Sequence, residues 1–96
     1  MSSKAERRAA QEKVSAYHEE QLGLLLAHVA SAIDRYRAGA LDAFDVDEVM
    51  FRYSRAAKEL WKFCNLRNVE LAAYVIDEDP PAGWWERAAP RQGRDR

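Results

Sequence analysis

The stretch DVDEVMFRYSRAAKELWKFC, residues 45–64, decides the fold because its apolar side chains recur at the spacing of one helix face. Its start, Asp45-Val46-Asp47-Glu48, fits a capping box with Asp45 as the cap. Phe44 and Val49 fit the hydrophobic staple that accompanies such a start. We therefore expect a helix that runs to about Phe63 or Cys64. The positions on its apolar face are Val46, Val49, Met50, Tyr53, Ala56, Ala57, Leu60, Phe63 and Cys64, with Trp61 at the edge.

A longer amphipathic pattern precedes this segment. Ser3-Lys4-Ala5-Glu6 fits a capping box, and Gly39 is suited to a left-handed stop after the last turn. These signals predict a helix from about Ser3 to Ala38. Its apolar face consists of Val14, His18, Leu22, Leu25, Leu26, Val29, Ala32, Ile33 and Tyr36.

The short link between the two segments predicts an antiparallel helical hairpin. We expect a short third helix over Val69–Ile76 with Asn68 as its cap, although the second helix could instead continue through Asn65 with a bend. No run has the alternation of a strand, so the predicted class is all-α. Residues 1–79 form the expected helical domain. Residues 80–96 form a tail whose first part packs on the helices and whose end, after Glu86, is disordered.

The two main helices differ in predicted length, at about 35 and about 19 residues, or about 50 and about 28 Å. The N-terminal stretch through about Gln11 therefore has no partner inside the hairpin, and it is polar on every side. Two interpretations stay open for this arm. It is either a solvated helix end or a segment that docks on another chain.

Composition bounds the class of protein. The 96 residues are 48% apolar and 32% charged, with 15 basic and 16 acidic side chains. A net charge of -1 argues against a protein that coats DNA. The one cysteine excludes an intramolecular disulfide. Neither a signal peptide nor an apolar run of about 18 residues is visible, so we expect a cytoplasmic protein with no membrane partner.

Few residues suggest catalytic chemistry. His18 and His28 lie about 15 Å apart along one helix and cannot share a metal ion, and Cys64 falls on the core face. We expect no enzyme activity, no metal and no cofactor. A catalytic role for His18 with Tyr36 or Tyr53, in a cavity between the helices, is the third hypothesis.

Spare apolar side chains indicate protein binding. Trp84 and Trp85 either plug the hairpin or anchor a partner, and Phe51 is either covered by the chain or free to stack on a partner. A stripe on the first helix, with Tyr17, Leu24 and His28, flanks the core and receives either the third helix or a second subunit.

The leading hypothesis is a non-catalytic interaction module, either a homo-oligomer or a regulatory subunit that binds another protein, such as an antitoxin-like protein or an adaptor. The alternative is an accessory protein that binds nucleic acid. It would use the basic face of the second helix and the arginine-rich tail. The basic face consists of Arg52, Arg55, Lys58 and Lys62.

Overall fold

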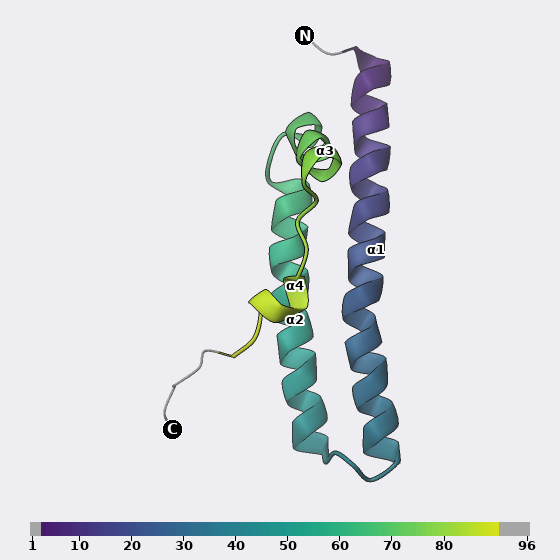
Figure 1. Ribbon diagram of the computed structural model, residues 1–96, viewed down its shortest axis with the longest axis vertical. Helices are drawn as coiled ribbons and strands as arrows, with labels where there is room; N and C mark the ends of the chain where they lie inside the picture. Colours follow the sequence, from purple (N-terminus) through teal and green to yellow (C-terminus); the bar gives the residue numbers. More distant parts are fainter. Residues whose placement is uncertain (1–2, 91–96) are drawn as a thin grey trace.

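The computed structural model describes residues 3–90, which form four helices and no strand. α1 (Lys4–Arg37) and α2 (Ala43–Asn65) run antiparallel as a long hairpin. α3 (Val69–Glu78) lies at the end of α2, and the single turn α4 (Trp84–Arg87) lies against α2 (Figure 1). The all-α hairpin with a long first helix, a short third helix and a tail is confirmed.

The ends of α1 follow the sequence signals. Ser3 Oγ accepts a hydrogen bond from the Glu6 amide at 3.1 Å, and Glu6 Oε1 accepts one from the Ser3 amide at 2.8 Å. This is the expected capping box. At the other end Gly39 has φ of 85°, the left-handed conformation that a glycine adopts without strain.

α2 begins earlier than expected. Asp42 is the N-cap, and its Oδ1 accepts from the Asp45 amide at 2.8 Å, while Asp45 Oδ2 accepts from the Asp42 amide at 3.0 Å. Asp45 is thus the third helical residue rather than the cap. The predicted staple is also wrong, since Phe44 is 81% exposed. The reason is that Asp42 and Asp45 are three residues apart, so each carboxylate can accept a hydrogen bond from the other residue's amide. This capping box makes the two residues between them helical.

α3 gives the N-terminal arm a partner. Asn68 Oδ1 accepts from the amides of Glu70 and Leu71, as the sequence suggested, and the helix continues two residues beyond Ile76. Its packing buries Ala10 of α1, and Lys13 Nζ lies 2.8 Å from Asp77 Oδ1. Of the described residues of this arm, only Ala10 is buried, and residues 3–9 and Gln11 stay exposed, so the two interpretations of the arm stay predictions.

The core occupies one half of the hairpin. We call residues 4–25 of α1 and 56–65 of α2, with α3 and α4, the capped half, and residues 26–37 and 43–55 the loop half. The buried cluster lies in the capped half. Its members are Ala10, Val14, Tyr17, Leu25, Ala56, Leu60, Phe63, Cys64, Ala72, Ala73, Trp84 and Ala88.

The loop half has one buried side chain within the described residues, Ala32. Leu26, Tyr36 and Met50, predicted to lie in the core, are about half exposed. Two helices alone bury only the line along which they touch, and the apolar stripes are wider than that line.

Candidate interaction surfaces

Trp84 fixes the tail to the hairpin from inside the core. The ring is 7% exposed, and its Nε1 donates a hydrogen bond of 2.9 Å to Tyr17 Oη. The Tyr17 hydroxyl in turn donates to the Pro81 carbonyl at 2.6 Å, and both rings flank Phe63. Burial raises the pKa of Tyr17. Two of the residues named from sequence as partner-binding, Trp84 and Tyr17, thus bond to each other within the chain.

Trp85 is held between the two long helices. His28 stacks on its ring with 4.1 Å between the ring centroids and 3° between the planes. The guanidinium carbon of Arg52 lies 4.3 Å from the Trp85 ring centroid, a cation–π contact. Arg52 Nε also donates to the Trp85 carbonyl at 3.0 Å. Trp85 and His28 therefore join α4 to the hairpin, and Trp85 remains half-buried.

The basic face of α2 is largely engaged by the chain itself. Arg55 donates to the Ala88 carbonyl through Nε at 3.2 Å and Nη2 at 3.0 Å. Lys62 Nζ lies 3.3 Å from Glu59 Oε2. Beyond Glu86 the structure describes the tail as far as Pro90, and Ala88 is buried; residues 91–96, on which the predicted disorder falls, lie outside the described part of the chain.

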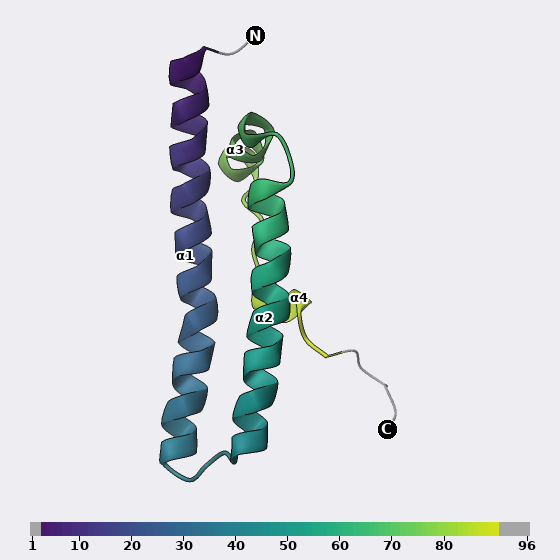
Figure 2. The same ribbon diagram turned by 180° about the vertical axis from the view of Figure 1, so that it is seen from behind.

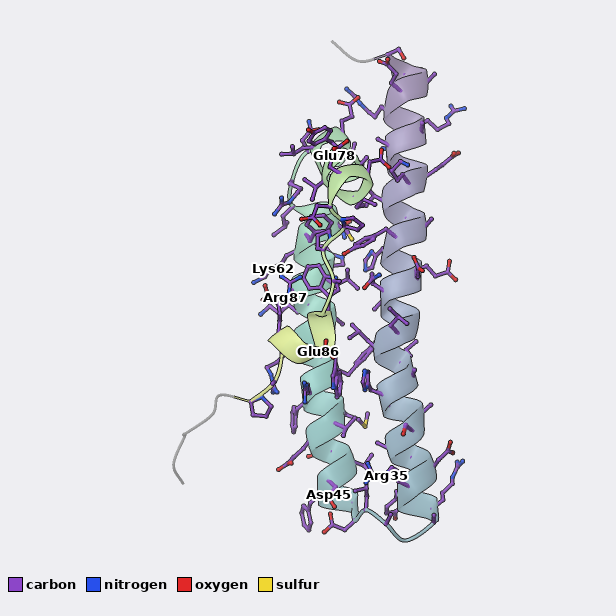
Figure 3. All side chains as sticks on the ribbon, in the orientation of Figure 1. Arg35, Asp45, Lys62, Glu78, Glu86 and Arg87 are labelled. Carbon is purple, nitrogen blue, oxygen red and sulfur yellow. The ribbon has the colours of Figure 1, made fainter. Side chains whose placement is uncertain are left out.

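A shallow groove of about 520 Å³ lies between α2 and α4, with Arg55, Lys58 and Arg87 among its lining residues. Arg87 Nη2 donates to the Ala82 carbonyl at 2.9 Å. In Figure 3, Lys62 and Arg87 extend on the side of α2 that faces away from α1. The lining thus has three cationic side chains, and it also includes the carboxylate of Glu59.

Two of the partner-binding residues named from sequence remain open. Phe51 is 60% exposed and is not covered by α3 or α4, and Leu24 is 58% exposed. They belong to different helices: Leu24 lies about 20° around α1 from Tyr17, on the α4 side, whereas Phe51 lies about 180° around α2 from the buried Leu60. The structure does not bring them together into one patch.

A more extensive apolar surface lies on the side opposite α4. On α1 it is a row with steps of four and three residues, the spacing by which helices pair. This row lies roughly 130° around the helix from Tyr17 and His28, which face α4. Its members are Leu22, Leu26, Val29, Ile33 and Tyr36.

α2 supplies the second row, roughly 170° around the helix from Arg52 and Arg55. Its members are Val46, Met50, Tyr53, Ala57 and Trp61. We call the ten residues of the two rows the back face. Figure 2 shows this side of the hairpin, with α1 and α2 next to each other and α4 behind α2.

The back face is uncharged and incompletely covered. None of its ten side chains is ionised at neutral pH, and Leu26, Tyr36, Met50 and Trp61 are each about half exposed. Within residues 3–90, no element of the chain lies over its loop-half portion. Nine of these residues are predicted from the sequence to face the core, and Trp61 is predicted at its edge. Their heptad-like spacing was the signal that a second packing surface was present.

Of the candidate catalytic residues, His18 and Tyr36 lie about 27 Å apart along α1, counted at about 1.5 Å per residue, and Tyr53 lies on α2. His18 is half-buried, and no group of three histidine, cysteine or acidic side chains among residues 3–90 is placed to hold a metal ion. Burial raises the pKa of the Cys64 thiol to about 11, so it stays protonated at neutral pH. None of the described helices is both long and apolar enough to cross a membrane.

Comparison with known proteins adds no relative. No protein-family model matches the chain, and neither does any curated protein or any solved structure.

Proposed function

We propose that the chain is a non-catalytic interaction module that binds protein through the back face. The observation that carries the proposal is a continuous row of uncharged apolar side chains on each of two adjacent helices, about half exposed at Leu26, Tyr36, Met50 and Trp61. Monomeric proteins rarely leave large contiguous apolar patches in water, and such patches mark interaction sites. Tryptophan and tyrosine are also the residues that most often anchor interfaces.

The arrangement of the back face suits protein rather than a small ligand. It is a flat layer of two helices, and the molecule measures only 18 Å along its shortest axis. Small-molecule sites are concave and enclose their ligands, whereas helices pair by laying apolar rows against one another. We propose that the chain uses this surface as a regulatory subunit or adaptor in the cytoplasm.

Nucleic-acid binding is the weaker candidate. Arg52 and Arg55 donate to carbonyl groups of the tail, and Lys62 pairs with Glu59. Only the groove between α2 and α4 favours it, since Lys58 and Arg87 line it with Arg55. Binding there would weaken steeply as the salt concentration rises, because phosphate contacts release counterions.

Affinity capture from the cytoplasm of the source organism tests the proposal. The tagged full-length chain is compared with the double variant Leu26→Glu/Met50→Glu, which puts two carboxylates on the back face. The matched control is Leu24→Glu/Phe51→Glu, which adds the same charge at equally exposed positions outside that face.

We expect the wild type and the control to retain the same bound protein, with the back-face variant losing it. The same protein on all three baits would show that the back face is not the binding surface. Loss on the control alone would move the site to Leu24 and Phe51.

A further inference from the structure

We infer that the partner of the back face is a second copy of this chain, packed face to face about a two-fold axis in the plane of the face. This inference rests on the proposed function, because it names the occupant of the same surface. The result would be a four-helix bundle of two stacked layers, in which every helix is antiparallel to its neighbours.

The absence of charge makes the face self-complementary. Stacking a copy on itself brings no like charges together across the interface, because none of the ten residues is ionised at neutral pH. A partner with a charged surface would instead have to bury its charges against apolar side chains, which is costly. The back face of a second copy is an uncharged surface of this kind.

The large side chains lie where a copy leaves room for them. Trp61 and Tyr36 lie at opposite ends of the back face, because α1 and α2 run antiparallel. Positions along the helices are counted at about 1.5 Å per residue. If the two-fold axis is parallel to the helices, Trp61 lies opposite Leu22 of the copy and Tyr36 opposite Val46. If the axis is perpendicular to the helices, Trp61 lies opposite Val46 and Tyr36 opposite Leu22. Large residues therefore meet smaller ones whichever way the copy points.

The area is sufficient for an interface between two subunits. The rows are about 25 Å long including their side chains, and two packed helices are about 20 Å wide. The face thus covers about 500 Å² on each subunit, or about 1,000 Å² for the pair. This reaches the size of about 1,000 Å² at which specific interfaces begin.

A second copy also supplies what the loop half lacks. That half buries only Ala32 among the described residues, so its apolar rows have no core of their own. Residues 91–96 read Arg-Gln-Gly-Arg-Asp-Arg and offer no apolar side chain to these rows. Packing two loop halves together would give each the buried layer that α3 and α4 give the capped half.

The test is the mass of the purified full-length chain in solution. Light scattering and sedimentation equilibrium are run from about 1 to about 200 μM, a range that covers dissociation constants typical of small interfaces. The variants are again Leu26→Glu/Met50→Glu and the control Leu24→Glu/Phe51→Glu. Circular dichroism checks that each variant keeps its helix content.

We expect the wild type and the control to reach twice the chain mass of 11.0 kDa, with the back-face variant dissociating on the order of 100-fold more readily. The thermal midpoint of the wild type should also rise with concentration, since association stabilises the folded state. This second measurement decides the matter if the variant loses helix content.

A wild type of 11.0 kDa at every concentration, with a constant thermal midpoint, would overturn the inference. A dimer unaffected by Leu26→Glu/Met50→Glu would also overturn it, because the copies would then meet elsewhere. The proposed function fails separately, in the capture experiment. A monomeric chain whose back-face variant loses a different protein would refute the self-association and keep the interaction module.

Discussion

The capped half and the loop half of the hairpin are equally rich in apolar side chains, but only the capped half has a core. Leu60 of α2 is fully buried, whereas Met50 of the same helix is 51% exposed. The difference arises because α3 and α4 enclose the capped half. The loop half meets α4 only where Trp85 contacts His28 and Arg52 and where Arg55 bonds Ala88, and no element within residues 3–90 lies over its back face. Two helices give a seam, and a third element is needed to enclose side chains on both sides of it.

The comparison teaches that apolar spacing predicts the direction of a side chain but not its burial. Leu26 and Leu25 are neighbours on the predicted apolar face of α1, yet Leu25 is 2% exposed and Leu26 50%. Leu25 points into the seam, and Leu26 points to the side opposite α4. The four predictions below test how far this contrast holds, in order of decreasing effect.

Truncation of one residue in each half should give the largest contrast. Leu60→Ala should lower the free energy of unfolding by about 3–4 kcal/mol, because it leaves a cavity in a packed core. Met50→Ala should cost less than about 1 kcal/mol in dilute solution, because half of that side chain is already in water. Urea unfolding of both variants at low protein concentration measures the difference.

Equal costs at the two positions would contradict the contrast between the halves. A cost for Met50→Ala that grows with protein concentration would instead sharpen it, because it would show that a second copy covers the loop half.

The pH dependence of the unfolding free energy should show that the capped half excludes water from the Cys64 thiol. The unfolded thiol ionises near its ordinary pKa of 9.0, whereas the folded thiol keeps its proton to about 11. Between these values the unfolded state binds fewer protons, so stability falls as pH rises, by about 2–3 kcal/mol in all. Below pH 9 this group has no effect.

Urea unfolding at pH 8, 9, 10 and 11 measures this fall, with Cys64→Ala as the control that lacks it. Tyr17, whose pKa is raised mainly by burial, contributes to both proteins, and somewhat less in Cys64→Ala because the charge of the Cys64 thiolate is one of the causes that raise the pKa of Tyr17. Parallel curves for wild type and Cys64→Ala would mean that water reaches the thiol in the folded state.

The two hydrogen bonds of the Tyr17 hydroxyl should contribute measurably to the free energy of unfolding. Tyr17→Phe removes the hydroxyl that accepts from Trp84 and donates to the Pro81 carbonyl, and both groups lose their partner. We expect a loss of about 2 kcal/mol, because unsatisfied buried polar groups are costly. Tyr36→Phe, at a half-exposed position of the loop half, should change the unfolding free energy very little.

Thermal and urea unfolding compare the two tyrosine variants. A similar small effect for both would show that the tail separates from the hairpin before the core unfolds.

The smallest effect is expected on the exposed side of α1, which faces away from α2. A Cβ added at Gly23 would meet nothing within 4 Å, so Gly23→Ala should raise the unfolding free energy by about 1 kcal/mol through helix propensity alone. Gly39→Ala is the matched control. It should lower the unfolding free energy by about 1 kcal/mol, because φ of 85° strains any residue with a Cβ. Destabilisation by Gly23→Ala would reveal a close neighbour on that side of α1.

Local signals in the sequence predicted the helices well and the candidate site poorly. The bounds of α1 and the cap at Asn68 depend on residues within one turn of each other, so they could be recognised without any tertiary contact. The start of α2 was placed three residues too late, because Asp42 and Asp45 both satisfy the capping rule and only the folded helix shows which one is used.

The roles of the tail residues could not be predicted in the same way. Trp84 and Trp85 are adjacent, yet one ring bonds Tyr17 in the core and the other lies between His28 and Arg52. These partners are separated by 33 to 67 residues along the chain. No local pattern records such pairings.

The all-α hairpin could be predicted from the amino-acid sequence, since apolar spacing, the helix caps and Gly39 are local properties of the chain. Which apolar rows are enclosed could not be predicted in this way, because it depends on the packing of α3 and α4. α3 and α4 cover one half and one side of the hairpin and leave the back face open. The physical reason is that burial depends on what packs against a side chain, and that neighbour comes from a distant part of the sequence or from another chain.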